Sequence, residues 1–526
     1  MVKWKQENVA GHIQKNKKRK RVNEMLKRIL CLLFVVLMIP FALFSCTKDK
    51  GKEDDSASGG SVATADLEND HLEARDYDGK VFRILSREST AYEFMGDSTG
   101  SNLYQKVKER DLAVESRFHV KIEQEKRAGD WTNRDDFSNY VSNLVLSGTS
   151  EAEESIHMIS THAGYLGSMA INGYGLDMTT LPNIDFTQSW WTRSFTDGAS
   201  VDGKVYFTVG DINLTLYEKL EVVFFNKKLA DDHHVEDLYA KVADGSWTYA
   251  EMFRIAKEFG GSKETGVESY ALLTNCHASR AFVTSWNIKL TRPNADTGRQ
   301  ELYLTGNQKL IDGYEAFYRL MTGTVADCPF SASTELATQA PLFAKDQSLF
   351  WTQMLQGVEE IKRLGMTSEF GILPFPLWDE AQFERTGYIS AAADNHNGIM
   401  VPSNVKEGEK DMVGMIIEAL CMYSRSTSIQ EYYETYLKYR SDTTDARIIS
   451  VMDTIRAGMN FSFAQAWSYN INYLYSYYSR AWANANNNGG IPDRSVTTQI
   501  NKYENGQKTL LADIYKKLDE LNASAS

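Results

Sequence analysis

Apolar and polar positions alternate in short blocks over the first half of the chain. Blocks rich in β-branched and large apolar residues predict strands at 81–85, 120–123, 156–160, 205–209 and 220–225. Between the first three blocks, apolar residues recur at helical spacing and predict helices at 103–117 and 137–146. Such alternation of strand and helix is typical of βαβ units, so we expect a largely parallel sheet.

The second half has fewer strand-like blocks and more helical periodicity. Thr248 and Glu251 form a Thr-x-x-Glu capping box, which predicts the start of a helix with an apolar face behind it. Aromatic and aliphatic residues at steps of three and four predict one helix over 463–482 and another over 511–521. The block at 398–401 predicts a late strand.

The first 46 residues differ from the rest of the chain. Basic residues at 15–21 and 27–28 precede an apolar run of 16 residues, 29–44, which would span about 24 Å as a helix. That length falls short of the ~30 Å hydrocarbon core, so the order of parts indicates a signal peptide rather than a membrane span. Leu43-Phe44-Ser45-Cys46 resembles a bacterial lipobox, in which Cys46 is lipidated and becomes the mature N-terminus. Met25 offers an alternative translation start.

Charge and composition bound the possible partners. The chain of 526 residues carries −13 at pH 7, and its segment 1–45 holds ten Lys and Arg against two Glu, which leaves −21 on the remainder. A strongly acidic exported chain is poorly suited to nucleic acid or to anionic headgroups, so we expect a neutral or cationic partner. Segment 46–78, rich in Asp, Glu, Ser and Gly, predicts a solvated tether after the leader.

Few sequence signatures point to catalysis. The chain holds no phosphate loop of the GxxxxGK[ST] type, no GxGxxG and no HExxH motif. Its His residues are scattered, and Cys276, Cys328 and Cys421 are too far apart for a CxxC signature, so we expect no metal or other cofactor. A pair of glycosidase carboxylates leaves no fixed spacing in a chain, so an exported glycoside hydrolase stays open as an alternative.

Several short motifs stand in the order found in one family of exported proteins. They are Val81–Leu85, Ile156–His162, Leu176–Pro182 with Ile184-Asp185, Trp190-Trp191, Gly203–Tyr206 with Gly210-Asp211, Val223–Leu229 and Asp244–Thr248. The Phe-Asn-Lys-x-Leu signal at 225–229 and the Gly-x-Trp-Thr helix start at 245–248 are the most specific. Together the motifs resemble extracellular solute-binding proteins of the carbohydrate-uptake type (family 1), the lipoprotein component of bacterial ABC importers. The resemblance covers about residues 80–260 and returns at 387–403.

The resemblance implies a two-lobed α/β fold of the type II periplasmic-binding-protein kind, with hinge crossings and a ligand cleft between the lobes. The expected divisions are a signal peptide at 1–45, a lipid anchor and tether at 46–78, a first lobe at 79–209 and 389–440, and a second lobe at 210–388 and 441–526. Such a protein captures a sugar or oligosaccharide without chemistry and delivers it to a permease. We expect a monomer without a nucleic-acid partner, anchored through Cys46 to the outer face of the bacterial cytoplasmic membrane, at the cell surface.

Three polar residues near the ends of predicted elements are candidates for binding a ligand in such a cleft. Glu88 follows the first strand, His162 ends the third, where family members place polar ligand contacts, and Asp211 stands beside Gly210 near the first crossing. Each has a structural alternative, as a solvated turn, a capped loop or a local turn. Asn395 joins them because it lies in the polar run 394–397, just before the late strand.

Two tryptophans are candidates for stacking against sugar rings. Trp286 and Trp351 stand beside short polar residues rather than inside apolar runs, although ordinary core packing is the alternative for both. Trp190-Trp191 match the family motif, and we expect them to fasten their loop to its lobe. A surface lipoprotein that binds polysaccharide without a transporter is a further alternative function, and a peptide or other solute stays open as the ligand.

Overall fold

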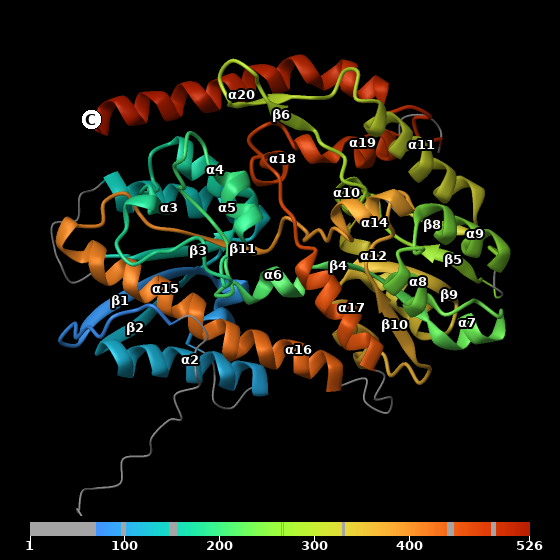
Figure 1. Ribbon diagram of the computed structural model, residues 1–526, viewed down its shortest axis with the longest axis horizontal. Coiled ribbons are helices and arrows are strands. Elements are labelled where there is room, and N and C mark those ends of the chain that lie inside the picture. Colours follow the sequence, from blue (N-terminus) through green and yellow to red (C-terminus); the bar gives the residue numbers. More distant parts are fainter. Residues whose placement is uncertain are drawn as a thin grey trace, which may run out of the picture. The chain divides into compact units, whose positions relative to one another are not determined.

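Two β-sheets, each covered by helices, organise the chain from residue 70 onward (Figure 1). The computed structural model describes residues 70–95, 101–146, 155–264, 266, 268–328, 332–438, 446–484 and 491–525. The predicted signal peptide, Cys46 and most of the predicted tether lie outside these residues and stay predictions. Within the described ranges, no helix has both the length and the apolar character needed to cross a membrane.

The first sheet has the strand order β11-β3-β1-β2. Its strands are β1 (Lys80–Arg87), β2 (Val120–Arg127), β3 (Met158–His162) and β11 (Asn397–Met400). β1 pairs in parallel with β2 and β3, whereas β11 arrives from late in the chain and pairs antiparallel to β3. Parallel strands are covered on both faces and therefore need apolar side chains on both. Ile84 and Leu85, which point to opposite faces, are accordingly both fully buried.

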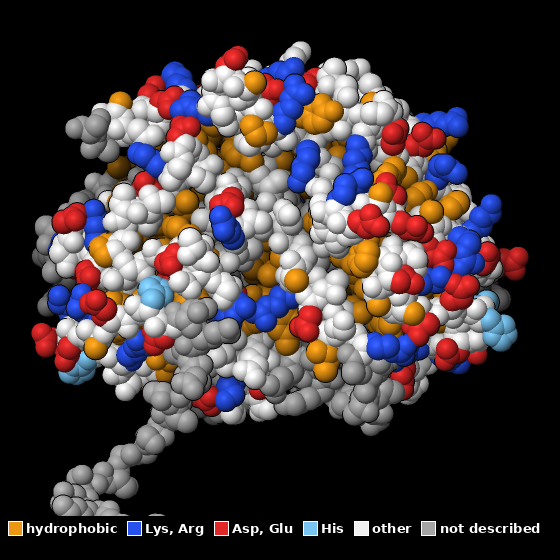
Figure 2. Space-filling model, viewed as in Figure 1, with side chains coloured by type: hydrophobic (Ala, Val, Ile, Leu, Met, Phe, Trp, Pro, Cys, Tyr) orange, Lys and Arg blue, Asp and Glu red, His pale blue; other side chains and the backbone are white. Residues whose placement is uncertain are grey.

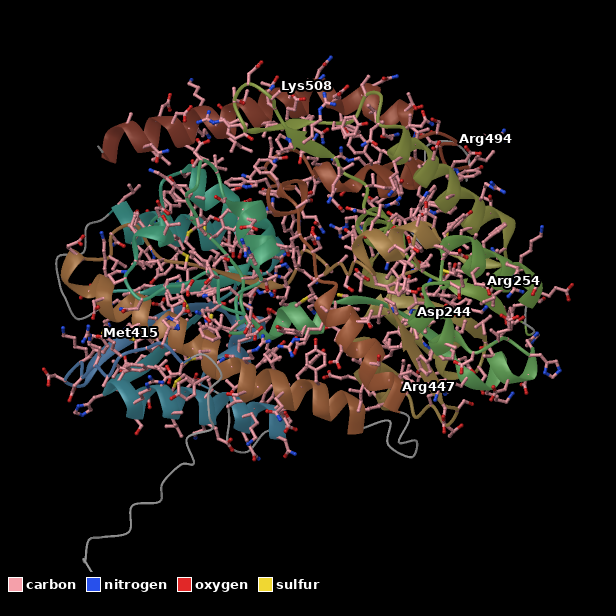
Figure 3. All side chains as sticks on the ribbon, in the orientation of Figure 1. Asp244, Arg254, Met415, Arg447, Arg494 and Lys508 are labelled. Atoms are coloured by element: carbon pink, nitrogen blue, oxygen red, sulfur yellow. The ribbon has the colours of Figure 1, made fainter. Side chains whose placement is uncertain are left out.

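Helices cover both faces of this sheet, and together with it they form the first lobe. They are α2 (Asn102–Phe118), α3 (Arg134–Leu146), α4 (Ala163–Ile171), α5 (Arg193–Ala199), α15 (Lys410–Ser426) and α16 (Ser428–Lys438). α2 and α15 share a core with Ile84, and α3 and α4 share one with Leu85. Met415 of α15, labelled in Figure 3, is fully buried in the first of these layers. The strands and helices predicted between residues 81 and 160 are confirmed.

The second sheet has the order β10-β4-β9-β5-β8 and mixed strand directions. Its strands are β4 (Glu221–Asn226), β5 (Tyr270–Leu273), β8 (Ala326–Asp327), β9 (Ser348–Met354) and β10 (Phe370–Leu373). β4 runs antiparallel to both of its neighbours, β9 and β10, while β5 runs parallel to β8 and β9. The largely parallel sheet expected from residues 81–160 is thus confirmed in the first sheet, whereas this second sheet is mixed.

The second lobe consists of this sheet and the helices around it. They are α7 (Lys227–Asp232), α8 (Leu238–Asp244), α9 (Tyr249–Phe259), α10 (Ser279–Ser285), α11 (Gln308–Gly323), α12 (Ala332–Ala344), α13 (Gly357–Arg363), α14 (Glu380–Thr386) and α17 (Ala446–Ala457). A separate hairpin pairs β6 (Thr291–Pro293) with β7 (Gln300–Leu302). The hydroxyl of Thr248 accepts a hydrogen bond from the Glu251 amide at 3.3 Å, which confirms the helix start predicted from the capping box.

Among the described residues, three segments cross between the lobes side by side. They are 211–220, which contains α6 (Leu214–Glu218), 390–396 and 457–461. Leu220 pairs with Ala392, and Ser390 with Met459, through single β-bridges. The fully buried carboxylate of Glu93, from the first lobe, accepts hydrogen bonds from the Thr215 amide and hydroxyl at 2.7 Å and from the Asn397 side chain. This carboxylate fastens the first lobe to the crossing segment 211–220 and, within the lobe, to the start of β11. The predicted lobe boundaries themselves stay predictions.

The C-terminal part departs from the predicted pattern in one place. The aromatic stripe over 463–482 is divided into α18 (Phe463–Ala466) and α19 (Tyr477–Ala483), so the prediction of one continuous helix is wrong. Asn472 and Tyr473 have φ of 47° and 49°, a left-handed backbone that ends any right-handed helix. The predicted helix over 511–521 is confirmed inside α20 (Thr497–Ala525).

The predicted strand at 205–209 is also wrong, although the segment does lie against the first sheet. Thr208 exchanges both backbone hydrogen bonds with Ile399 of β11, at 3.0 and 2.8 Å. Pairing stops after this single bridge, so the apolar run is buried without forming a strand.

Candidate functional site

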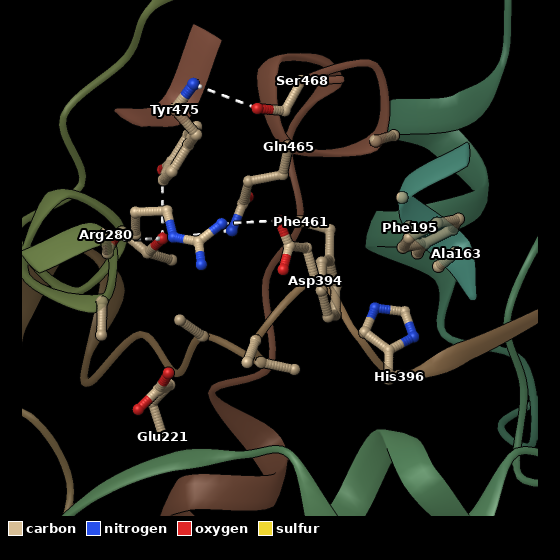
Figure 4. Close-up of a pocket in the computed structure, with 17 residues that line it drawn as sticks. Ala163, Phe195, Glu221, Arg280, Asp394, His396, Phe461, Gln465, Ser468 and Tyr475 are labelled. Carbon is tan, nitrogen blue, oxygen red and sulfur yellow. Dashed lines mark hydrogen bonds and ion pairs between the residues drawn. The ribbon is translucent and has the colours of Figure 1, made fainter. Parts of the chain in front are cut away.

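A pocket lies where the crossing segments pass between the lobes (Figure 4). Its empty volume is about 590 Å³, including the solvent at its mouth. The first lobe contributes Ala163, Gly164 and Phe195; the second contributes Glu221, Arg280, Ala281 and Thr284; the crossings contribute Ala391–Asp394, His396 and Phe461; and the C-terminal segment contributes Gln465, Ala466, Ser468 and Tyr475. Ala163 directly follows β3, so the pocket lies at the carboxyl end of a parallel strand, where open α/β sheets bind ligands.

An ion pair between the second lobe and a crossing segment forms one wall of the pocket. Nη1 of Arg280, on α10, lies 2.5 Å from Oδ2 of Asp394. Burial alone would raise the pKa of Asp394, but the charge and hydrogen bond of Arg280 hold it below its ordinary value. The Asp394 carboxylate is therefore ionised at neutral pH. Acidic and basic side chains are interspersed over the outer face shown in Figure 2, whereas this pair lies inside the pocket.

Two histidines beside the ion pair are uncharged at neutral pH. Burial lowers the pKa of His162 and of His396 to about 4, despite the favourable charge of Asp394 nearby. Nδ1 of His162 accepts a hydrogen bond from the Gly164 amide at 3.0 Å, and Nδ1 of His396 lies 2.8 Å from the Asn397 carbonyl. In a neutral imidazole one nitrogen donates and the other accepts, so these contacts leave Nε2 of His162 as a donor and Nε2 of His396 as an acceptor.

Three partly exposed aromatic side chains contact one another, and one of them, Trp131, lies against His162. We name them the aromatic wall: Trp131, Tyr469 and Tyr473. The Trp131 ring lies 5.3 Å from the His162 ring, 5.1 Å from Tyr469 and 6.0 Å from Tyr473, measured between centroids. Tyr473 is 36% exposed, which is unusual for an aromatic residue in this chain. The Arg134 guanidinium lies over the Trp131 ring, 4.8 Å from its centroid, so the ring that the wall exposes most is that of Tyr473.

None of the six residues proposed from the sequence lines this pocket, although two of them stand next to residues that do. His162 precedes the lining residue Ala163, and Asn395 stands between the lining residues Asp394 and His396. Asn395 is half-buried, and its backbone carbonyl accepts a hydrogen bond from Nη2 of Arg87 at 3.0 Å. The roles of His162 and Asn395 in binding stay predictions.

The other four proposed residues lie elsewhere. Glu88 is exposed at the start of a short 3-10 turn and does not line the pocket. Trp286 and Trp351 are fully buried inside the second lobe and do not line it either. Asp211 is buried beside a second cavity, where it pairs with Arg425 at 3.2 Å and Arg456 at 3.7 Å.

The sequence interpretation missed Arg280, Asp394 and Trp131. The polar run 394–397 was the one sequence feature that indicated this site. Asp394 and His396 of this run line the pocket, whereas the residue proposed from the sequence was Asn395. Arg280 and Trp131 carry no local signal, because they reach the site only through the packing of α10 and of the turn after β2. No group of three or more potential metal-ligating side chains occurs in the part of the chain that the structure describes.

The sequence matches no protein-family model and no curated protein. Solved structures are similar in fold, among them the sugar-binding protein MalE from Xanthomonas citri, with a TM-score of 0.55 and 13% identity over 84% of this chain and 99% of MalE. A sugar transporter from Rhizobium etli in an open conformation has a TM-score of 0.52 and 12% identity over 83% of this chain and 99% of that protein. UgpB from Mycobacterium tuberculosis, in complex with glycerophosphocholine, has a TM-score of 0.51 and 12% identity over 82% of this chain and 98% of UgpB. The chain therefore has the two-lobed α/β fold of periplasmic binding proteins.

Proposed function

We propose that this chain is an extracellular solute-binding lipoprotein that captures a sugar or oligosaccharide between its lobes and delivers it to an ABC permease. The observation that carries the proposal is the pocket itself, because both lobes and the crossing segments line it. A ligand that touches both lobes binds a closed arrangement more tightly than an open one, and that difference in affinity is the free energy available for closure.

The chemistry of the pocket suits a neutral, hydroxyl-rich ligand. The Arg280–Asp394 pair supplies charged donors and acceptors, while Gln465 and Tyr475 supply neutral ones. Sugars also have apolar C–H faces, for which the aromatic wall provides ring surfaces. Two proteins of the same fold support this ligand class, since MalE is a sugar-binding protein and the Rhizobium etli protein is a sugar transporter.

Binding without hydrolysis fits the carboxylates of the pocket better than a glycosidase does. A glycosidase needs one carboxylic acid with a raised pKa, which protonates the leaving oxygen, opposite a second carboxylate. Glu221 and Asp394 are the acidic residues that line the pocket, and the pKa of Asp394 is lowered by Arg280. Asp394 is therefore a poor general acid at neutral pH, so a glycosidase mechanism would need Glu221 as its acid.

A screen of thermal stability tests this function. The purified protein is heated with monosaccharides, oligosaccharides, amino acids and short peptides in turn, and any ligand that shifts the midpoint is measured by calorimetry. A ligand at ~100 times its dissociation constant should stabilise the fold by about 2.7 kcal/mol. A saturable shift with one class of sugar, recovered intact, supports the proposal. Cleaved sugar would favour the hydrolase, and binding confined to polymers would favour a surface polysaccharide-binding protein.

The location at the membrane is a separate part of the proposal, and it rests on the lipobox around Cys46. Lipidation of Cys46 would hold the monomer at the outer face of the cytoplasmic membrane, next to its permease. Replacing Cys46 by Ser should release the protein from the membrane fraction of the producing bacterium. Retention of a lipid-modified protein in that fraction after the substitution would refute the anchor.

A further inference from the structure

One segment of the C-terminal part, residues 461–475, lies across the pocket and is here named the cap. It supplies Phe461, Gln465, Ser468 and Tyr475 to the pocket lining. Figure 4 shows these four side chains around one end of the pocket, with the Arg280–Asp394 pair facing them. The cap also carries Tyr469 and Tyr473, two of the three residues of the aromatic wall.

The cap is hydrogen-bonded to the second lobe. Nε2 of Gln465 donates to the hydroxyl of Thr284, on α10, at 3.1 Å, and that hydroxyl lies 3.1 Å from the phenol oxygen of Tyr475. Within the cap, the Tyr475 amide donates a hydrogen bond to the hydroxyl of Ser468 at 3.1 Å. Two positions ten residues apart thus converge on one side chain of α10.

The same segment is fastened to the first lobe. Nδ2 of Asn470 donates to the hydroxyl of Ser168, on α4, at 3.0 Å. The buried ring of Trp467 meets Phe207 edge to face, with 5.3 Å between centroids. A Cβ atom on Gly167 would lie 2.5 Å from Oδ1 of Asn470 and 3.1 Å from the Trp467 ring. The cap therefore packs so closely against α4 that a larger residue at position 167 would displace it.

Helix α20 holds the cap from the side opposite to the pocket. Nε2 of Gln507, which is fully buried, donates to the carbonyl of Ile471 at 3.0 Å. Farther along α20, the side chain of Asn522 accepts hydrogen bonds from Lys204 and Tyr206 of the first lobe. The hydroxyl of Thr305, in the second lobe, donates to Glu504 at 2.5 Å. In Figure 1 this helix runs above both sheets, and it ties the cap to each lobe.

We infer that the cap closes one end of the pocket and limits the ligand to one or two sugar rings; this inference rests on the proposed function. The pocket, with an empty volume of about 590 Å³ including its mouth, is large enough for a small ligand. A longer saccharide would have to extend past Gln465 and Tyr475, in a cap that the contacts above hold to both lobes. A longer saccharide can therefore place only its terminal one or two rings in this pocket, and one ring beyond the pocket finds its place at the aromatic wall.

A length series tests the inference on the unmodified protein. Calorimetry is performed with the mono-, di-, tri- and tetrasaccharide of whichever sugar class the protein binds. Affinity should increase from one ring to two and then stay level or fall by about tenfold for three and four rings. Affinity that keeps rising with each added ring would overturn the cap as a limit while leaving the proposed function intact. Binding of no saccharide at all would overturn both.

Two variants then assign the limit to the cap. Gly167→Ala places a methyl group against Asn470 and Trp467, and Asn470→Ala removes the hydrogen bond to Ser168; neither Gly167 nor Asn470 lines the pocket. Gly408→Ala is the matched control, because a Cβ there meets no atom within 4 Å. The affinity ratio of tri- to disaccharide should rise by about tenfold in the first two variants and remain unchanged in the control. An unchanged ratio in a folded Asn470→Ala protein would overturn the inference.

Discussion

Two groups of aromatic side chains in this protein have opposite surroundings. Trp286 and Trp351 are fully buried in the second lobe, where each ring packs against other aromatic rings. The aromatic wall of Trp131, Tyr469 and Tyr473 is partly exposed beside the pocket. The sequence predicts ligand stacking for the first group and gives no signal for the second.

The difference shows that polar neighbours in the sequence do not indicate exposure. Ser285, next to Trp286, is buried and donates a hydrogen bond to the Phe282 carbonyl at 3.3 Å. Thr352, next to Trp351, is buried as well, and its hydroxyl donates to that of Thr274 at 2.6 Å. A small hydroxyl side chain that finds a partner enters a core at little cost. Short polar residues beside a tryptophan are therefore compatible with either surrounding.

Replacing Trp286 by Ala should produce the largest effect, and it should be an effect on stability. The ring is 0% exposed and lies 5.1 Å from Phe282 and 5.3 Å from Trp378, so its removal leaves a large cavity. We expect the free energy of unfolding to fall by about 3–5 kcal/mol in denaturant titrations. Ligand affinity of the folded fraction should change little. Lost affinity with unchanged stability would instead assign Trp286 to ligand stacking and break the comparison.

A second pair of buried indoles allows a sharper test, because it has a titratable partner. The Nε1 groups of Trp190 and Trp191 donate to the two oxygens of Glu418, each at 2.9 Å, which agrees with the expectation that this motif fastens its loop. Burial raises the pKa of Glu418 from 4.5 to about 8, against the effect of the two indole donors. The folded protein keeps this carboxyl protonated at a pH where the unfolded chain does not.

The sign of the pH dependence follows from proton binding. Between pH 4.5 and about 8 the folded state holds a proton on Glu418 that the unfolded state has lost, so the free energy of unfolding falls as pH rises through this window. The fall should be at most about 5 kcal/mol in the native protein, since one pKa unit corresponds to about 1.4 kcal/mol. Glu418→Gln cannot ionise and should flatten the slope, measured by denaturant titration at several pH values. An equal slope in both proteins would show that another group causes it.

Much of the first lobe could be predicted from the sequence because its signals are local. The strand at 81–85 is covered on both faces and therefore reads as a continuous apolar run.

The stripe over 463–482 predicted burial correctly, since Trp467, Leu474 and Tyr478 are all in the core. It did not predict the break, which falls where Asn472 and Tyr473 take a left-handed backbone; Asn tolerates that conformation, but Tyr gives no signal for it.

The pocket could be predicted only in part, because its residues come together from distant segments. Arg280 and Asp394 are 114 positions apart, and their pairing depends on where α10 meets a crossing segment. His162 and the run 394–397 were within reach of prediction, since both stand at the ends of strands of one sheet. Trp131 was not, because its exposure depends on the cap that packs against it from more than 300 positions away.

The smallest predicted effect concerns the aromatic wall and should be an effect on binding. Tyr473→Ala removes a ring that is 36% exposed, so the free energy of unfolding should change by less than about 1 kcal/mol. If the ring stacks on the ligand, affinity measured by calorimetry should weaken by about 1 kcal/mol, or roughly fivefold. The matched control is Tyr303→Ala, which removes a half-buried ring that lies against Arg292 and does not line the pocket.

The comparison of Tyr473→Ala with Trp286→Ala separates two uses of aromatic area. A buried ring contributes through packing that is lost only when the protein unfolds, whereas an exposed ring has an unsatisfied face that only a ligand can cover. Trp286→Ala should therefore lower the free energy of unfolding and leave ligand affinity nearly unchanged, whereas Tyr473→Ala should lower ligand affinity and leave the free energy of unfolding nearly unchanged. If Tyr473→Ala and Tyr303→Ala leave affinity equally unchanged, the wall is a support for the cap, and the ligand is held by the polar groups of the pocket alone.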